Sequence, residues 1–177
     1  MNIETLIHAP RTMMEVFEAL PEGTNIQLIE NNLVMSPAPI TTHQLLLMEI
    51  SSQMHVFCKK LNLGKVFIAP CDVYLDKKNA FQPDISFVST EHNDCIKRNG
   101  LYGAPDLIIE ILSPATAKYD KGEKKNAYER SGVKEYWVID PEDYLCICYQ
   151  LINGKYQEVF QGTGMLESNL LGCKIEF

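Results

Sequence analysis

The order of apolar and polar residues predicts a short helix and then a hairpin at the start of the chain. Residues 12–20 open with a capping-box pattern, Thr12 to Glu15, which is typical of a helix N-terminus. Residues 25–36 contain two apolar stretches on either side of Glu30-Asn31-Asn32. Asparagine tolerates the left-handed conformation of a tight turn, so this segment predicts a β-hairpin.

A long amphipathic helix is predicted over residues 42–61, with Gly64 as its expected stop. Its apolar residues recur every three or four positions, which predicts one stripe facing the core. The stripe consists of Leu47, Ile50, Met54, Phe57 and Leu61.

Short apolar stretches after this helix predict a sheet. The expected strands are 65–69, 72–75, 84–88, 106–112, 133–139, 144–151 and 155–160. A loop over 90–104 is expected to hold one short helical turn, and Asn153-Gly154 predicts a hairpin. A helix is predicted over 120–131, with Asp120 as N-cap and Gly132 as stop. The fold class is therefore α/β (α+β): one domain over 1–177 with a central mixed sheet flanked by helices.

Composition limits the partners that the chain can have. The formal net charge of −7 argues against a large nucleic-acid-binding face, because contacts to phosphates need positive charge. A local basic strip could offset this charge, although a solvated helix face explains the same residues. The strip consists of Lys118, Lys121, Lys124, Lys125, Arg130 and Lys134.

No apolar run is long enough for a membrane span, and the first twenty residues lack the apolar core of a signal peptide. The six cysteines form no CxxC pair and no zinc-binding spacing. We therefore expect a cytoplasmic protein without a membrane partner, whose cysteines are reduced.

Three acidic residues stand at or within apolar strands. Asp84 and Asp106 each follow a proline at a strand start, and Glu110 lies in the middle of the apolar run 106–112. A buried carboxylate is costly unless it is paired. If the two strands are neighbours, Asp84 and Glu110 can converge from one face and bind Mg²⁺ through oxygen ligands. Asp106 is expected to end a turn and to stay in water.

Four stretches carry a family resemblance: IQLIENNLVMSPAPITTHQ, FIAPCDVYLD, QPDISFVS and GAPDLIIEILSPATAKYDKGEKKNAYERSGVKEYWVID. In this order the chain resembles the PD-(D/E)XK nuclease superfamily and, more specifically, the Uma-type "putative restriction endonuclease" family (domain of unknown function 820). The resemblance implies a restriction-endonuclease-like fold and a catalytic site that includes Asp84 and Glu110 as metal ligands.

The resemblance also implies a lysine in the site, but this chain departs from the motif. The position two residues after Glu110 is Leu112, where the superfamily has its lysine. Lys124, on the predicted helix 120–131, is where the family keeps a lysine, and it completes the implied catalytic set. Lys118 and Lys125 are the alternatives.

Three further positions are possible accessory residues. Gln27 stands where the family has a glutamate that completes the metal site, and a neutral amide is a weaker Mg²⁺ ligand. Gln27 could bind through water, or Glu30 could contribute instead. His43 matches a family histidine and could contact phosphate, although a capping or core histidine fits equally well.

The leading hypothesis is thus a Mg²⁺-dependent endonuclease acting on DNA, with Mn²⁺ as a second possible metal. DNA is favoured over RNA, and two copies would pair as a homodimer to cut both strands. The alternative is a non-catalytic nucleic-acid-binding or interaction module on a degenerate nuclease fold, which Gln27, Leu112 and the acidic balance favour. An RNase, or a nuclease for structured DNA, is a third possibility.

Overall fold

Two six-stranded sheets form the frame of the molecule in the computed structural model, which describes residues 9–21 and 23–177. The first half contains α1 (Met13–Glu18), β1 (Ile26–Ile29), β2 (Asn32–Met35), α2 (Thr41–Leu61), β3 (Gly64–Ile68), β4 (Val73–Asp76), β5 (Asn79–Phe81) and β6 (Ile85–Ser89). The second half contains the 3₁₀ helix η1 (Thr90–Cys95), β7 (Ile96–Lys97), β8 (Gly100–Tyr102), β9 (Leu107–Ile111), α3 (Ala117–Lys121), α4 (Glu123–Ser131), β10 (Glu135–Ile139), β11 (Leu145–Ile152), β12 (Lys155–Thr163), β13 (Met165–Ser168) and β14 (Cys173–Glu176).

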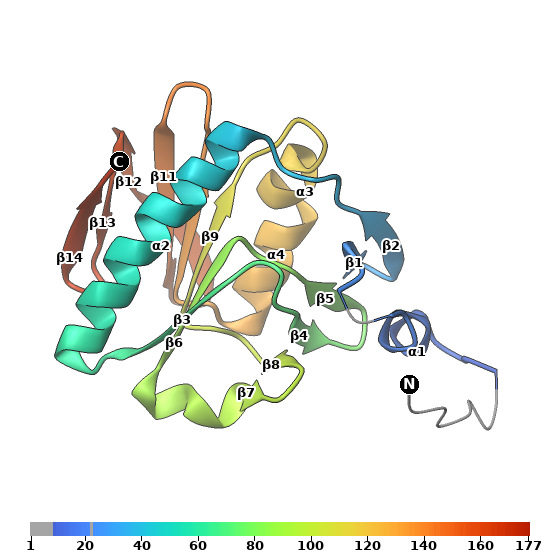
Figure 1. Ribbon diagram of the computed structural model, residues 1–177. Helices are drawn as coiled ribbons and strands as arrows, with labels where there is room; N and C mark the ends of the chain where they lie inside the picture. The colour runs from blue at the N-terminus through green and yellow to red at the C-terminus, as the bar shows by residue number, and fades with distance from the viewer. Residues whose placement is uncertain (1–8, 22) are drawn as a thin grey trace.

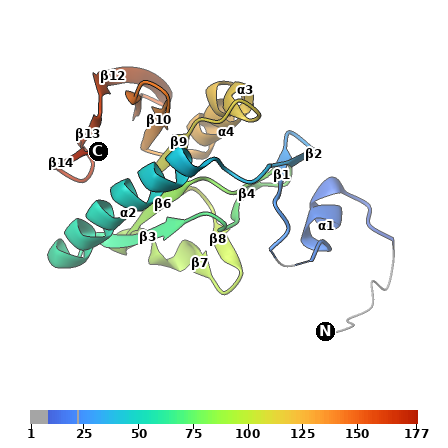
Figure 2. The same ribbon diagram turned by 45° about the horizontal axis from the view of Figure 1, so that its top comes forward.

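The central sheet has the strand order β12-β11-β10-β9-β6-β3. Its strands β9 and β10 are parallel, and its other neighbours are antiparallel, so the sheet is mixed. The second sheet has the order β2-β1-β5-β4-β8-β7. Figure 2 shows α1 apart from the central sheet, beside the β1–β2 hairpin. The predicted fold class is therefore confirmed.

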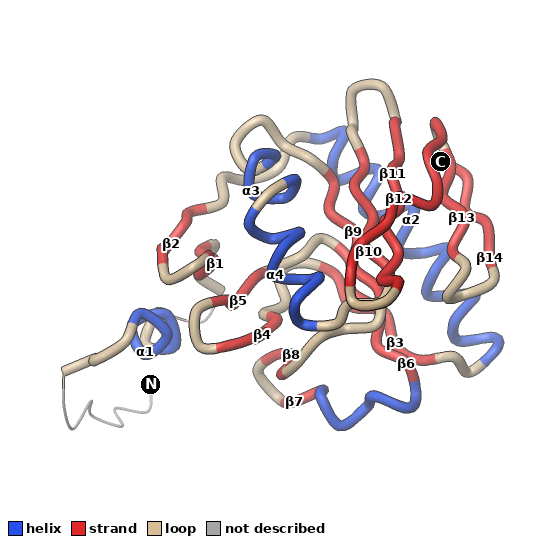
Figure 3. Tube along the Cα trace, turned by 180° about the vertical axis from the view of Figure 1, so that it is seen from behind, coloured by secondary structure: helices blue, strands red, loops and turns tan. Residues whose placement is uncertain are grey.

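Alternation along β9 assigns its side chains to two opposite layers. Leu107, Ile109 and Ile111 pack in the core that contains α2. Ile108 and Leu112 pack in the core that contains α4. Figure 1 shows α2 in front of the central sheet, and Figure 3 shows α3 and α4 in front of it from behind. Even-numbered side chains of β9 therefore point toward α4, because successive side chains of a strand point to opposite faces.

The predicted β1–β2 hairpin is confirmed as a two-residue turn. Glu30 and Asn31 have φ of 45° and 67°, and Ile29 pairs with Asn32 across the turn. Positive φ at both central residues gives the backbone twist that matches two antiparallel strands.

The long helix is confirmed, but its buried stripe and its end differ from the prediction. Leu61 is 52% exposed, and Cys58 occupies the core position instead. Leu61 lies on the same side of the helix as Met54, but it is the last residue of α2, so the helix ends before its side chain is covered. Asn62, with φ of 53°, ends the helix in the left-handed conformation. Gly64 is not the stop but the first residue of β3, where an added Cβ would lie 2.1 Å from the Val88 carbonyl oxygen.

The region between β6 and β9 contains more structure than predicted. The expected helical turn is η1, and two short strands, β7 and β8, follow it. All six cysteines are free thiols, as expected. Within the part of the chain that the structure describes, no helix combines the length and the apolar character that crossing a bilayer requires.

A buried glutamate attaches the C-terminal β13–β14 hairpin to the central sheet. The Glu135 carboxylate accepts hydrogen bonds from Ser168 Oγ at 2.5 Å, Asn169 N at 2.9 Å and Leu170 N at 3.1 Å. Glu135 is 1% exposed, so water cannot replace these bonds. The carboxylate therefore fixes the chain between β13 and β14.

We expect Glu135→Ala to lower the free energy of unfolding by about 2–4 kcal/mol, because it leaves the buried Ser168 hydroxyl and two partly buried backbone N–H groups without an acceptor. Urea denaturation measures this change. Glu158→Ala, at an exposed position of β12, is the control and should change stability by less than about 0.5 kcal/mol. Equal effects of the two substitutions would contradict the role given to Glu135.

Candidate active site

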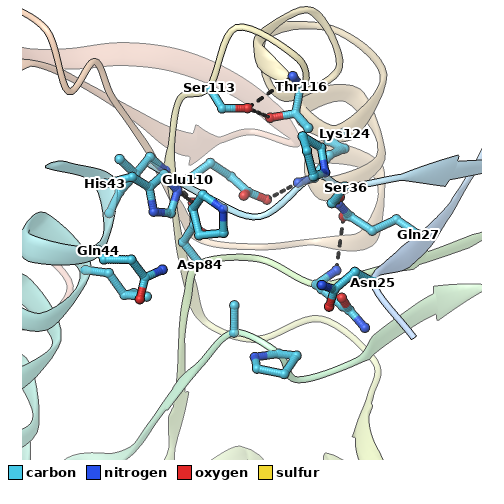
Figure 4. A pocket seen from close by; sticks show the side chains of 17 residues that line it. Asn25, Gln27, Ser36, His43, Gln44, Asp84, Glu110, Ser113, Thr116 and Lys124 are labelled. Carbon is cyan, nitrogen blue, oxygen red and sulfur yellow. Dashed lines mark hydrogen bonds and ion pairs between the residues drawn. The ribbon is translucent and has the colours of Figure 1, made fainter. Parts of the chain in front are cut away.

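Two carboxylates meet where β6 and β9 lie side by side. These strands are antiparallel, with Ile85 opposite Ile109, so Asp84 and Glu110 follow at the next step of the register. Both side chains line one cavity of about 290 Å³, seen in Figure 4. The predicted convergence of Asp84 and Glu110 from neighbouring strands is therefore present in the structure.

Glu110 points toward α4, as its even-numbered position in β9 requires. It is 3% exposed. Its Oε1 lies 2.5 Å from Lys124 Nζ and accepts a hydrogen bond from the Tyr128 hydroxyl at 2.7 Å. Its second oxygen, Oε2, has no hydrogen-bond partner among the described residues. One carboxylate oxygen is thus fixed by the protein, and the other is available to the cavity.

Lys124 reaches this carboxylate from a helix rather than from the strand. It is 2% exposed, and its Nζ also lies 2.8 Å from Asp120 Oδ1. Burial disfavours the charged ammonium, but the carboxylates of Asp120 and Glu110 outweigh it, so the pKa of Lys124 is raised above its usual range. The lysine is therefore protonated, and it lies where the strand motif has none.

Burial raises the pKa of Glu110 most strongly, and the charges of Asp120 and Asp84 raise it further, while Lys124 opposes them. The carboxylates of Asp84 and Asp120 thus both act on Glu110, and Lys124 contacts Glu110 and Asp120. The local excess of negative charge favours the arrival of a cation.

Asp120 corrects the predicted start of the helix. The predicted helix is broken at Gly122, which has φ of −119° and ψ of −102° and separates α3 from α4. Asp120 lies inside α3 and is 2% exposed, so it is not an N-cap. Its Oδ2 accepts a hydrogen bond from Thr116 Oγ1 at 3.0 Å. A sequence signal existed in the four-residue spacing of Asp120 and Lys124, which is typical of an ion pair on a helix.

Asp84 is oriented by one backbone group and one histidine. Its Oδ2 accepts a hydrogen bond from Ile111 N at 2.7 Å and lies 3.2 Å from His43 Nε2. Burial opposes the charged imidazole, but the bond to Asp84 outweighs it, so the pKa of His43 is raised above its usual value. His43 Nδ1 is buried and has no partner among the described residues. His43 thus supports a carboxylate from the first turn of α2.

Gln27 lines the cavity, but its amide is already committed. Its Oε1 accepts from Gln82 N at 3.1 Å, and its Nε2 donates to Ser36 Oγ at 2.9 Å. Gln27 is therefore fixed by two bonds and holds the β1–β2 hairpin beside β5 and β6.

The remaining sequence candidates lie elsewhere. Glu30 pairs with Arg130 at 2.5 Å, outside the cavity. Lys118 lies over the Tyr119 ring, and Lys125 lies 3.4 Å from the centroid of the Tyr149 ring. The structure therefore brings together Asp84, Glu110, Lys124, Gln27 and His43, and it leaves out the other three.

Asp106 is not in water, contrary to the prediction. Its side chain is fully buried, and its Oδ1 lies 2.8 Å from Lys134 Nζ and 2.9 Å from His92 Nδ1. Its Oδ2 accepts a hydrogen bond from Ser89 N at 2.8 Å. The proline before Asp106 suggested an exposed turn, but the loop after β6 and the residue before β10 both close over it.

The oxygens left open in the cavity fit a hard divalent cation. Asp84 Oδ1, like Glu110 Oε2, has no hydrogen-bond partner among the described residues. Mg²⁺ takes one or two carboxylates from a protein and completes its shell with water and phosphate oxygens. The described residues contain no group of three or more potential His, Cys, Asp or Glu ligands, so any metal here would rest on these two carboxylates.

A mixed sheet between helices, with two carboxylates from adjacent strands and a lysine from a helix packed on the sheet, defines a restriction-endonuclease-like fold. The family model Uma2, described as "Putative restriction endonuclease", matches residues 14–176. The chain belongs to this family.

A solved structure supports the fold. The crystal structure of "a putative nuclease belonging to DUF820" from Anabaena variabilis ATCC 29413 has a TM-score of 0.75 and 20% sequence identity, over 92% of each chain. At this identity the similarity shows the fold alone. No curated protein is significantly similar to the chain.

Proposed function

We propose that this protein is a divalent-metal-dependent nuclease that hydrolyses phosphodiester bonds in DNA. The observation that carries the proposal is the contact between Lys124 Nζ and Glu110 Oε1 in the cavity that also holds Asp84. The helix supplies the positive charge that the strand lacks at Leu112. Family membership supports the nuclease class.

The protein's own groups have separable roles in this reaction. Asp84 and Glu110 would hold Mg²⁺ or Mn²⁺ through the oxygens that face the cavity. When bound, the cation would offset phosphate charge and polarise the phosphoryl group. The Lys124 ammonium would stabilise the charge that develops on the phosphate, in a buried site where such an interaction is strong. Asp120 and Tyr128 keep the ammonium and the Glu110 carboxylate in place.

One observation favours the alternative, a non-catalytic nucleic-acid-binding module. Gln27 stands where the resemblance implies a third acidic ligand, and its amide oxygen is occupied by the Gln82 N–H. A metal would therefore have two carboxylates instead of three. Metal-dependent cleavage decides between the two functions.

We expect the wild-type protein to nick supercoiled plasmid with Mg²⁺ or Mn²⁺ and not with EDTA. Asp84→Asn and Glu110→Gln should each reduce the rate by about 100-fold or more, because each removes a charge that acts on the transition state. Glu158→Ala is the control and should cleave normally. If both site variants cleaved at the wild-type rate, this cavity would not be the active site. If the folded wild type did not cleave at all, the binding module would be favoured.

A single domain over residues 1–177, a cytoplasmic location and a homodimer that cuts both strands stay predictions. Gel filtration followed by cleavage of a short duplex addresses the homodimer, because a single copy would nick one strand at a time.

A further inference from the structure

The cavity that holds Asp84 and Glu110 has almost no positive charge in its walls. Among the described residues that line it, Lys124 is the only lysine or arginine, and two carboxylates already surround it. Proteins that bind duplex DNA neutralise several phosphates with lysine and arginine. A cavity wall with so few lysines and arginines, in a chain of net charge −7, suits a ligand that presents few phosphates.

Neutral amides take the place of cations at the cavity wall, and two of them are uncommitted. Gln27 and Gln82 use their amides for bonds within the protein. The side chains of Asn25 and Gln44 form no hydrogen bond with any described residue, and both residues are exposed. Figure 4 shows Gln44 on the α2 side of the pocket and Asn25 on the opposite side, next to the hairpin.

The size of the cavity also limits what can enter. A volume of about 290 Å³ is at the lower end of small-molecule sites, which begin near 300 Å³. This is the scale of one nucleotide rather than of a duplex. In a duplex the bases are stacked between the two backbones, so amides inside so small a cavity could reach a base only if its nucleotide is unpaired and leaves the stack.

We propose that the site acts on DNA whose nucleotide at the cleavage point is unpaired, and that Asn25 and Gln44 read its base. The inference rests on the proposed nuclease function, and it names the substrate of the same site. An amide offers one donor group and one acceptor, a combination that matches the N7 atom and the N6 amino group of adenine bidentately. Adenine next to the cleaved bond is therefore the expected preference.

Binding and cleavage of matched oligonucleotides test the proposal. Fluorescence anisotropy with Ca²⁺ in place of Mg²⁺ measures the affinity for a single strand, a fully paired duplex and the same duplex with one unpaired adenine. The single strand and the bulged duplex should bind at least about tenfold more tightly than the paired duplex. With one or two phosphates contacted, log K should fall with log salt at a slope of roughly −1, far shallower than that of a duplex-binding protein.

The same assay tests the two readers. Gln44→Ala and Asn25→Ala should each weaken binding about 5- to 100-fold and remove the preference for adenine over other bases. Gln157→Ala, an exposed glutamine of β12 outside the cavity, is the matched control and should change neither affinity nor preference.

The outcomes separate this inference from the proposed function. Cleavage of paired duplex as fast as of single strand, lost in Asp84→Asn, would overturn the inference and keep the nuclease. If the protein bound the single strand through Gln44 but did not cleave it with Mg²⁺ or Mn²⁺, the inference would hold for a binding site and the nuclease function would be overturned. Neither binding nor cleavage of any oligonucleotide would overturn both.

Discussion

Lys124→Met is expected to lower the free energy of unfolding by about 3–5 kcal/mol, because it leaves two buried carboxylates without their cation. Glu110 and Asp120 are 3% and 2% exposed, and both contact the Lys124 ammonium. The side chain of methionine preserves most of the packing volume of the lysine, so the loss of stability measures the effect of removing the ammonium charge. Guanidinium denaturation at neutral pH measures it.

A triple variant distinguishes charge balance from packing. Glu110→Gln and Asp120→Asn, combined with Lys124→Met, remove both uncompensated charges and should recover most of the lost stability. The triple variant should still have no nuclease activity. Lys121→Met, at an exposed position of α3, is the matched control and should change stability by less than about 0.5 kcal/mol. A loss below about 1 kcal/mol in Lys124→Met would contradict the buried pair.

Asp106→Asn is expected to destabilise the protein at neutral pH by about 2 kcal/mol, because it leaves the Lys134 ammonium facing a neutral group instead of a carboxylate. Burial opposes ionisation of Asp106, but hydrogen bonds from Lys134 and Ser89 outweigh it, so the pKa of Asp106 is lowered from 3.8. A carboxyl with a lowered folded-state pKa stabilises the fold above its unfolded pKa, and this contribution is lost as pH falls through the folded value.

Urea denaturation between pH 7 and pH 3 tests this dependence. The wild type should lose the Asp106 contribution below about pH 4, whereas Asp106→Asn should lack that part of the acid-induced decline. Asp94→Asn, at an exposed position of η1, is the control and should follow the wild-type curve. If Asp106→Asn and the wild type lose stability in parallel as pH falls, the ion pairs of Asp106 do not stabilise the fold.

The sequence was sufficient for those parts of the site that depend on strand periodicity. Glu110 stands in an apolar run, and alternation placed it on one face of its strand together with Leu112. The structure agrees because neighbouring antiparallel strands leave little freedom in where such side chains point. Burial of a carboxylate requires a partner, and the sequence predicts a metal ion in that role, whereas in the structure Lys124 and the Tyr128 hydroxyl contact Glu110.

The parts that sequence reasoning missed depend on contacts between distant segments. Asp106 was expected in water because nothing local indicates that Lys134 and the loop after β6 close over it. The sequence predicts Asp120 as a helix cap because aspartate is a frequent N-cap residue, whereas the structure places it inside α3 and breaks the helix at Gly122. Gln27 and Gln82 are 55 positions apart in sequence, so their bond follows from the meeting of two hairpins.

The break at Gly122 also has a consequence for motion. It leaves α4 with nine residues, which is shorter than a helix that is stable by itself in water. The helix therefore depends on its docking against the sheet, and undocking it would withdraw Lys124 while Asp84 and Glu110 stay on their strands. The presence of the Lys124 ammonium in the site thus depends on the equilibrium between docked and undocked α4. The amide hydrogen exchange rates of α4 would measure the fraction of molecules in which the helix is docked and the site is complete.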